Sequence, residues 1–209
     1  MKIRSTRKEY KIIKSIFDDE TNPLKKFRKW YKEAEKKVSE PNAFTLSTSL
    51  NNKPTSRMML LKGIDKDLIF YTNNLSKKGK QIKINKYASM VFWWKEIQRQ
   101  VRIEGKLKEI PKENVLEYFY SRPIESQIGA LVSKQSSKLS TYNDILKEFK
   151  INITKYIIEK KPVPMPDSWT GYILDPNLFE FWQGSNFRLH QRLEFKKKKN
   201  VWIKSVLSP

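Results

Sequence analysis

Short runs of alternating apolar and polar residues, rich in β-branched and aromatic side chains, occupy much of the chain after Pro41. Alternation with a period of two places every second side chain on one face of a strand, so these runs predict half-buried β-strands. We expect seven or eight short strands among runs at residues 43–50, 56–63, 67–73, 87–96, 99–110, 169–175, 178–184, 192–198 and 201–207. The lysine-rich stretch 196–200 lies between the last two runs, where we expect a hairpin turn.

Apolar residues at helical spacing interrupt these runs. They predict helices over residues 23–38, 76–86, 111–120, 124–132 and 140–160. Because the helices do not alternate regularly with the strands, the pattern favours an antiparallel barrel over a parallel doubly wound sheet. The expected fold class is therefore mainly β with flanking helices. We expect residues 1–22 to form a mobile N-terminal arm or a short helix, and residues 23–209 to form a single domain.

The composition removes many kinds of chemistry. The 209 residues include no cysteine and one histidine, His190, which excludes disulfides, thiol catalysis, cysteine zinc sites and a histidine-rich metal site. We therefore expect no metal. The chain has no apolar stretch long enough to span a membrane, and its first residues are charged, so we expect a cytoplasmic protein without a membrane partner. It also has no glycine-rich phosphate-binding motif.

The net charge of +21 suggests nucleic acid or an anionic surface as a partner. However, the 43 basic residues comprise 34 lysines and 9 arginines, and the lysines are dispersed. A genome rich in A and T codons accounts for the excess equally well. A basic barrel that binds single-stranded nucleic acid on tyrosine and tryptophan platforms is the alternative function. The aromatic residues lie apart from the lysine runs, which counts against nucleic acid as a partner.

Two segments place cations at a strand end or a helix start, where phosphate groups bind well. In the run Arg57–Lys62, alternate residues share a face, and a cation stands at each end. Farther along, Ser76 suits the N-cap of a helix whose first residues are Lys77 and Lys78. The alternatives are an ordinary core strand with charged ends and a solvated basic helix.

A third segment carries Tyr118 and Arg122, four residues apart on one predicted helix face, followed by Ser126 in the first turn of the next helix. These side chains and the free N–H groups of that turn can converge on one phosphate. The alternative is a corner between two helices with a structural arginine.

In a fourth segment, alternation predicts that Arg188, His190 and Arg192 share one strand face. The flanking cations favour the neutral, hydrogen-bonding form of the imidazole. The alternative is a purely structural histidine.

Together these segments resemble the pyridoxamine 5′-phosphate oxidase family over nearly the whole chain, in the motifs RMMLLK, FYTN, SKK, RQV, YFYSRPIES, QIGA, SKQSS and FWQG…RLHQR. The resemblance implies an FMN-binding split β-barrel that acts as a homodimer with two active sites at the subunit interface. It also implies the oxidation of pyridoxamine or pyridoxine 5′-phosphate to pyridoxal 5′-phosphate, by hydride transfer to flavin N5. Dioxygen then reoxidises the flavin and gives hydrogen peroxide. A related flavin protein with another electron acceptor is a further alternative.

The resemblance implies roles for residues by their position in these motifs. The FMN-binding residues are Arg57, Met58, Met59, Leu60, Leu61, Lys62, Tyr71, Thr72, Lys77, Lys78, Gln100, Gln135, Ser136, Trp182 and Arg192. The substrate-binding residues are Arg7, Tyr10, Lys62, Tyr118, Arg122, Ser126, Arg188 and His190. Arg188 and His190 are the expected catalytic residues over the pyridine ring, where Arg188 positions the reacting amine or alcohol. Arg7 and Tyr10 help to close the site.

Two residues depart from the family pattern. Lys77 stands where the family usually has arginine, so a point charge replaces a bidentate fork and weaker binding of the FMN phosphate is expected. Gln191 stands where the family has aspartate. Glutamine still accepts a hydrogen bond, so we expect the geometry to survive in more positive surroundings.

Overall fold

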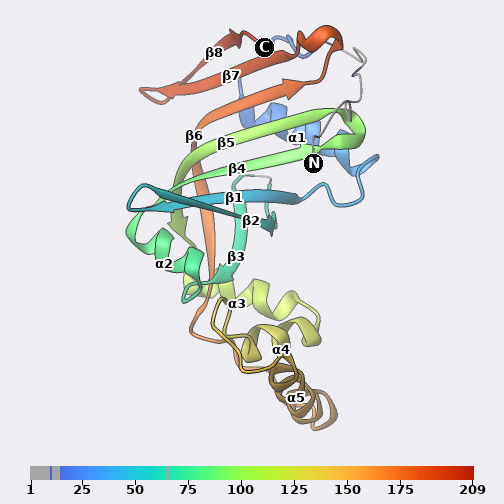
Figure 1. Ribbon diagram of the computed structural model, residues 1–209, viewed down its shortest axis with the longest axis vertical. Coiled ribbons are helices and arrows are strands. Elements are labelled where there is room, and N and C mark those ends of the chain that lie inside the picture. The colour runs from blue at the N-terminus through green and yellow to red at the C-terminus, as the bar shows by residue number, and fades with distance from the viewer. Residues whose placement is uncertain (1–9, 11–14, 65) are drawn as a thin grey trace, which may run out of the picture.

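The computed structural model describes residue 10, residues 15–64 and residues 66–209. Within them, eight antiparallel strands form one sheet in the order β2-β1-β4-β5-β6-β7-β8, with β3 paired to β6 (Figure 1). The strands are β1 (Ala43–Leu50), β2 (Lys53–Leu60), β3 (Leu68–Asn73), β4 (Tyr87–Trp94), β5 (Arg99–Glu109), β6 (Trp169–Gln183), β7 (Gln191–Lys198) and β8 (Val201–Leu207). The expected strand number and the mainly β class are confirmed.

The long strand β6 joins the two parts of the sheet. Its residues 169–174 pair with β3, its residues 178–183 pair with β7, and β5 runs along both parts. The two separate strands predicted over 169–175 and 178–184 are therefore one strand, and that prediction is wrong. Pro176 and Asn177 mark a shift in register rather than a turn. Gly105 is required opposite this shift, because a Cβ there would lie 2.2 Å from the carbonyl oxygen of Asp175.

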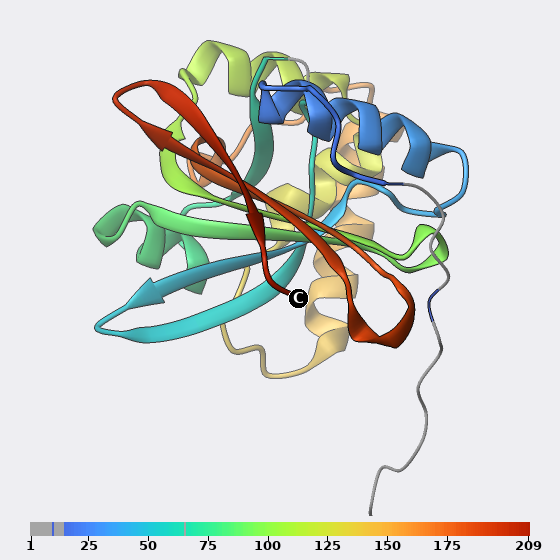
Figure 2. The same cartoon turned by 90° about the horizontal axis from the view of Figure 1, so that it is seen from above.

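The sheet does not close into a complete barrel. Among the described residues, the edge strands β2 and β8 each pair on one side only. Seen from above, the strands fan out from one another as a strongly twisted sheet (Figure 2). The barrel is thus split, with the β7–β8 hairpin and the helices α3–α5 at opposite ends of the long axis (Figure 1).

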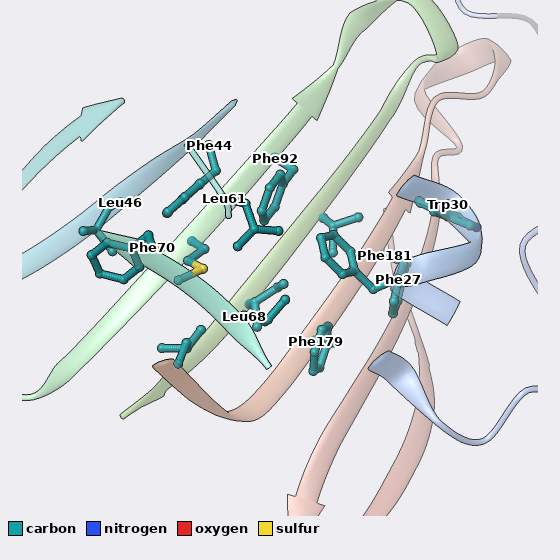
Figure 3. Packing of buried hydrophobic residues seen from close by; sticks show 14 of the residues in the cluster. Phe27, Trp30, Phe44, Leu46, Leu61, Leu68, Phe70, Phe92, Phe179 and Phe181 are labelled. Atoms are coloured by element: carbon teal, nitrogen blue, oxygen red, sulfur yellow. The ribbon is translucent and has the colours of Figure 1, made fainter. Parts of the chain in front are cut away.

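Two apolar clusters hold the helices α1 (Pro23–Glu35), α2 (Lys77–Ile84), α3 (Lys112–Ser121), α4 (Ile124–Val132) and α5 (Tyr142–Ile153) to the sheet and to one another. In the larger cluster, Phe27 of α1 packs on Phe92 of β4 with ring centroids 5.0 Å apart (Figure 3). The smaller cluster lies among α3, α4 and α5 around Phe119 and Ile128. No helix among the described residues is long and apolar enough to cross a membrane.

Several boundaries differ from the predicted ones. The first helix ends at Glu35, and the predicted helix 140–160 consists of α5 followed by a π-helical turn, Thr154–Ile158. The strand predicted over 56–63 begins at Lys53 and ends at Leu60. It begins early because Asn51 and Asn52, with φ of 49° and 59°, make a two-residue hairpin turn. A similar pair at residues 199–200, with φ of 44° and 64°, forms the predicted turn between β7 and β8.

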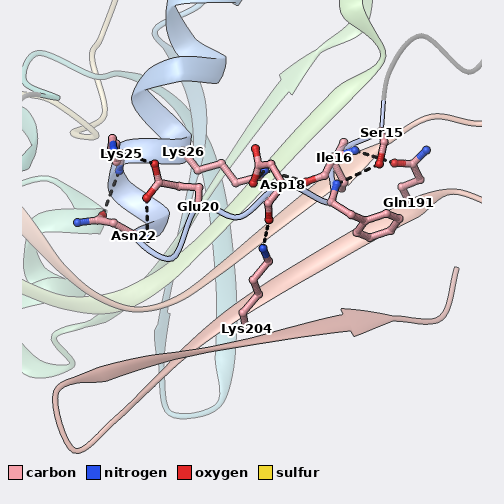
Figure 4. A network of polar contacts seen from close by, with 10 residues as sticks. Ser15, Ile16, Asp18, Glu20, Asn22, Lys25, Lys26, Gln191 and Lys204 are labelled. Atoms are coloured by element: carbon pink, nitrogen blue, oxygen red, sulfur yellow. Dashed lines mark hydrogen bonds and ion pairs between the residues drawn. The ribbon is translucent and has the colours of Figure 1, made fainter.

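The described stretch 15–22 of the predicted N-terminal arm contains no helix and is fastened to the sheet (Figure 4). The buried Lys26 donates to the carbonyl of Ile16 and forms an ion pair with Asp18, both at 2.8 Å. Burial lowers the pKa of Lys26, and Asp18 opposes that shift. On the other side, Gln191 accepts a hydrogen bond from the Ile16 N–H at 2.9 Å, and Lys204 donates to the carbonyl of Asp18. Gln191 thus accepts a hydrogen bond, as expected.

Candidate active site

The first turn of α2 presents cations beside free backbone N–H groups. Ser76 is the N-cap, and its hydroxyl accepts from the Gly79 N–H at 3.3 Å, as the sequence predicts. Lys78 is only 6% exposed, and its Nζ donates to Oε1 of Gln135 at 2.7 Å. Thr72 at the end of β3 reaches the same Gln135 oxygen at 3.4 Å. The N-terminus of a helix carries partial positive charge, so this corner attracts anions.

Arg57 of β2 adds a second cation to this corner. Its guanidinium donates to the carbonyl of Leu46 at 3.0 Å and to the hydroxyls of Thr48 and Thr55 at 2.7 and 2.6 Å. Burial lowers the pKa of Arg57. Burial, and secondarily the charge of Arg57, lower the pKa of Lys78 to about 8. We call Arg57, Thr72, Lys78 and Gln135 the α2 cluster.

The α2 cluster lacks a counter-ion. The hydrogen-bond partners of Arg57 and Lys78 are carbonyl, hydroxyl and amide oxygens, and neither residue forms an ion pair within the described part of the chain. Buried cations are normally paired with an opposite charge, because an unpaired one pays a desolvation penalty without compensation. The geometry therefore fits a ligand that brings negative charge into the cluster.

A second group surrounds Arg122 at the C-terminus of α3, and we call Tyr71, Tyr118 and Arg122 the Arg122 cluster. The rings of Tyr71 and Tyr118 stack at 3.8 Å, and the Arg122 guanidinium lies 4.4 Å from the ring of Trp169. Arg122 Nη2 donates to the backbone carbonyl of Ser126 at 2.9 Å. Its Nη1 is buried without a hydrogen-bond partner among the described residues. Burial lowers the pKa of Arg122, and the open Nη1 fits an anionic acceptor.

The structure changes two details of this group. Arg122 follows the last residue of α3 in extended conformation, so it does not continue the helix face that carries Tyr118. Ser126 contributes its carbonyl to Arg122, rather than its hydroxyl as expected for a shared phosphate site. The two residues are nevertheless adjacent, as predicted.

The third group lies at the far end of β6. Gln100 of β5, Trp182 of β6 and Arg192 of β7 are direct cross-strand neighbours, so they form one row on one face of the sheet. His190 packs on Trp182 with ring centroids 4.7 Å apart. We call these four residues the β6–β7 cluster.

The backbone at Ser185 favours the neutral form of the His190 imidazole. Its Nδ1 accepts from the Ser185 N–H at 3.1 Å, which requires that this nitrogen carry no proton. Tyr10 lies with its ring 5.8 Å from both His190 and Trp182, edge to face. Gly184 leaves room for Tyr10, because a Cβ there would lie 2.8 Å from the tyrosine ring.

The prediction that Arg188, His190 and Arg192 share one strand face is wrong. The strand β7 begins at Gln191, and Arg188 belongs to a short 3-10 turn, Asn186–Arg188. Phe187 and Arg188 have φ of 55° and 64°, and such left-handed conformations cost about 1–3 kcal/mol each in a non-glycine residue. Arg188 is exposed on this strained turn, close in sequence to the cluster but outside its row.

The α2 cluster and the β6–β7 cluster are far apart in one chain. Tyr71, beside the α2 cluster, pairs with Gly171 near the start of β6, whereas Trp182 lies eleven positions farther along the strand. At about 3.3 Å per residue, this separation is about 36 Å along β6. One chain therefore presents the two clusters as separate surfaces.

Comparison with known proteins gives a consistent result. Residues 31–156 match the family model described as Pyridoxamine 5'-phosphate oxidase, and residues 169–209 match the model of the Pyridoxine 5'-phosphate oxidase C-terminal dimerisation region. The chain belongs to the pyridoxamine 5′-phosphate oxidase family. A protein of Haemophilus influenzae named Pyridoxine/pyridoxamine 5'-phosphate oxidase is 41% identical, and the alignment covers 100% of both chains.

Two solved structures share the fold of this chain. PhzG from Burkholderia lata, in complex with tetrahydrophenazine-1-carboxylic acid, is similar with a TM-score of 0.86 and 26% identity, covering 92% of this chain and 95% of that one. An FMN binding protein from Nostoc punctiforme, described as pyridoxamine 5'-phosphate oxidase-related, has a TM-score of 0.72 at 14% identity, covering 91% and 100%. The split β-barrel fold expected from the sequence is thereby confirmed.

The remaining residues that the family resemblance singles out lie along β2 and just beyond it, at the start of α2 and in the loop after α4, with one exception. Along β2 and just beyond it, Arg57, Met59 and Leu61 point inward and Met58, Leu60 and Lys62 outward, as the alternation predicts. Lys77 is exposed at the first position of α2, and Ser136 follows Gln135 in a loop with φ of 70°. Arg7 lies outside the described residues.

Sequence reasoning missed the polar residues that hold Arg57 in place. Gln81 of α2 accepts from the hydroxyls of Thr48 and Thr55 at 2.7 and 2.8 Å, and lies 3.4 Å from the Arg57 guanidinium. One signal was available, because Gln81 lies three residues after Lys78 on the same helix and must share its face. The threonines gave no signal, because their approach depends on the pairing of β1 with β2.

Gly79 allows the first turn of α2 to pack against the end of β3. A Cβ at Gly79 would lie 2.3 Å from the backbone oxygen of Asn74, which cannot move aside easily. Gly79→Ala is therefore expected to lower the free energy of unfolding by about 1–3 kcal/mol, measured by urea denaturation. The matched control is Gly129→Ala in α4, where a Cβ meets no atom within 4 Å. The control should be neutral or stabilising, and equal losses in both variants would contradict this account.

Proposed function

We propose that this chain is an FMN-dependent oxidase that converts pyridoxamine 5′-phosphate or pyridoxine 5′-phosphate to pyridoxal 5′-phosphate. The observation that carries the proposal is the pair formed by the half-buried Arg57 and the buried Lys78, whose partners among the described residues are all neutral. Such a pair fits a phosphate dianion. The name of the full-length Haemophilus influenzae relative supports the same activity.

The α2 cluster fits the phosphate of FMN. Arg57 and Lys78 would bind its oxygens together with the free N–H groups of α2, while Thr72 and Gln135 would complete the polar wall. Lys77 is exposed at the rim, so we expect it to contribute less than an arginine fork would. When bound, FMN would supply the acceptor for the hydride that leaves C4′ of the substrate, with dioxygen as the final oxidant.

The Arg122 cluster fits the phosphate of the substrate. Nη1 of Arg122, which has no hydrogen-bond partner in the described part of the chain, would donate to it, and Tyr118 would contribute its hydroxyl. The exposed Lys62, which follows β2, and Ser126 in the first turn of α4 are the further phosphate ligands that we propose. Tyr71 joins the two phosphate sites, because it neighbours Thr72 in the sequence and stacks on Tyr118. The two sites would therefore suit two phosphorylated ligands that lie side by side.

A second copy of the chain would supply the β6–β7 cluster. Residues 169–209, which contain β6, β7 and β8, match a dimerisation region, and this cluster lies too far along β6 to reach the α2 cluster of its own chain. In the dimer, Gln100, Trp182 and Arg192 would border the flavin. Arg188 would position the reacting amine or alcohol, with the neutral His190 beside it and Tyr10 covering the site.

Absorption spectroscopy and an oxidase assay test the proposal. Protein purified without added flavin should show the visible flavin bands and should oxidise pyridoxamine 5′-phosphate in air, with one hydrogen peroxide formed per pyridoxal 5′-phosphate. A colourless protein that FMN does not reconstitute would overturn the proposal. Bound FMN with substrate oxidation but no peroxide would indicate a different electron acceptor. Tight single-strand nucleic-acid binding with a steep salt dependence would instead support the basic binding module.

The pKa of Lys78 predicts how FMN binding depends on pH. Because this pKa is about 8, the free protein loses the proton from Lys78 above that pH, whereas a bound phosphate favours the charged form. Binding must then take up a proton, so the dissociation constant of FMN should rise up to about tenfold per pH unit between about pH 8 and about pH 9.5. Lys78→Arg, which stays protonated, should remove this dependence, and an identical pH profile in the variant would contradict the role of Lys78.

The same shift affects the stability of the FMN-free protein. In the unfolded chain Lys78 has the ordinary lysine pKa of 10.5. Between about pH 8 and pH 10.5, Lys78 is therefore protonated in the unfolded chain and deprotonated in the folded one. Unfolding then takes up a proton, so the contribution of Lys78 to the free energy of unfolding increases with pH across this interval. Opposite slopes for FMN affinity and apoprotein stability would separate this effect from general alkaline denaturation.

A further inference from the structure

Glu180 is a carboxylate on the outer face of the sheet, yet it is only 4% exposed. It lies on β6 two positions before Trp182, so both side chains project from the face opposite the core residues Phe179 and Phe181. Its direct neighbour on β5 is Arg102. Glu180 therefore lies in the cross-strand row of residues next to the row that Gln100, Trp182 and Arg192 form.

Each carboxylate oxygen of Glu180 holds one arginine. Oε1 accepts from Nε of Arg192 at 2.9 Å, and Oε2 lies 3.1 Å from Nη1 of Arg102. Arg192 also donates through Nη1 to the carbonyl of Ser208 at 2.9 Å. Two of its three nitrogens are thus fixed, and Nη2 has no hydrogen bond within the described residues. The guanidinium plane is set, with one edge left for a ligand.

Burial of the Glu180 carboxylate costs free energy, and a contribution to folding stability does not explain why this residue is a glutamate. Burying a carboxylate is expensive, and buried ion pairs are often no more stabilising than apolar residues of similar size. Glu194 stands directly opposite Glu180 on β7, which adds a like charge. Arg102 also donates to Glu104 at 2.9 Å, so it is shared between two carboxylates, whereas among the described residues Arg192 donates to Glu180 and Ser208 alone.

We propose that Glu180 is a positioning residue that aims the Nη2 edge of Arg192 at the flavin, while Arg102 fixes Glu180 from the opposite side. This inference rests on the proposed function, in which Arg192 contacts FMN across the dimer interface. A glutamine in place of Glu180 offers only one oxygen and turns an amide donor toward an arginine. Arg102 keeps Glu104 as an acceptor, whereas Arg192 loses its charged acceptor and with it one of the two bonds that fix its direction.

The test is FMN affinity of the apoprotein, measured by quenching of flavin fluorescence, in Glu180→Gln. We expect the dissociation constant of FMN to increase about tenfold. This change corresponds to the loss of one hydrogen bond between charged groups. The matched control is Glu194→Gln, which removes a carboxylate from the neighbouring strand and should leave FMN affinity within about twofold. In an Arg192→Met background, Glu180→Gln should have no further effect on FMN affinity, because the residue it positions is gone.

Each outcome decides the proposal. Wild-type FMN affinity in Glu180→Gln, or an equal loss in Glu194→Gln, would overturn it, as would full additivity with Arg192→Met. If Glu180→Gln fails to fold, Glu180→Asp keeps the charge with a shorter reach, and unchanged FMN affinity in that variant would overturn the proposal. Failure of the wild-type chain to bind FMN would reject the proposed function itself, and this inference with it.

Discussion

Replacing Lys78 by methionine is expected to weaken FMN binding by about 30- to 150-fold, which corresponds to about 2–3 kcal/mol for a lost hydrogen bond between charged groups. Lys78 is almost completely buried, and among the described residues its Nζ has two partners, Gln135 and Ser76, which are both neutral. Methionine fills a similar volume without a charge. Titration of the apoprotein with FMN, followed by fluorescence, measures the change in affinity.

The stability of this variant separates binding from folding. Burial already lowers the pKa of Lys78 to about 8, so the charged side chain costs the empty site free energy. Lys78→Met should therefore unfold at the same temperature as wild type or higher. Lys80→Met, on the exposed side of the same helix, should leave FMN affinity unchanged. Equal weakening in both variants would show that only the net charge of α2 matters.

The second large effect is expected at Arg122. Arg122→Lys should raise the KM for pyridoxamine 5′-phosphate by about 10- to 100-fold, because a point charge replaces the planar fork that stacks on Trp169 and presents its free Nη1. The apparent kcat should change less than the KM, since the phosphate takes no part in the bond changes at C4′. Steady-state kinetics with saturating FMN measure both parameters.

The control for Arg122 is the substrate without its phosphate. Wild type should strongly prefer pyridoxamine 5′-phosphate over pyridoxamine, and Arg122→Lys should lose most of that preference. FMN affinity should be unchanged, because Arg122 belongs to the other phosphate site. A variant that loses FMN affinity and retains its preference for the phosphorylated substrate would show that the two sites have been assigned the wrong way round.

Local patterns predict most of the strands of this fold but not the way they combine. The alternation in Arg57–Lys62 correctly separates inward from outward side chains, because a half-buried strand imposes a period of two. The same reasoning divides β6 at Pro176, since proline and asparagine usually end a strand. Pairing with β5 along the whole length, and the room left by Gly105, allow the strand to continue. The local pattern of apolar and polar residues does not predict such long-range strand pairing.

The candidate site shows the same limit. Ser76, Lys77 and Lys78 are predictable because a helix start is a local feature, and the structure places them there. The strand face expected for Arg188 and His190 is absent, because the chain makes a strained turn before β7 begins. Glu180, which lies between the apolar residues Phe179 and Phe181, carries no local signal for its role. Its partners come from two other strands.

The most direct test of the central claim is the reaction of the purified protein with its substrate in the absence of air. Pyridoxamine 5′-phosphate, added anaerobically to the FMN-loaded protein, should bleach the visible flavin band and yield one pyridoxal 5′-phosphate per flavin. Admission of air should then restore the band with formation of hydrogen peroxide. A flavin band that stays unchanged with saturating pyridoxamine 5′-phosphate and pyridoxine 5′-phosphate would contradict the account.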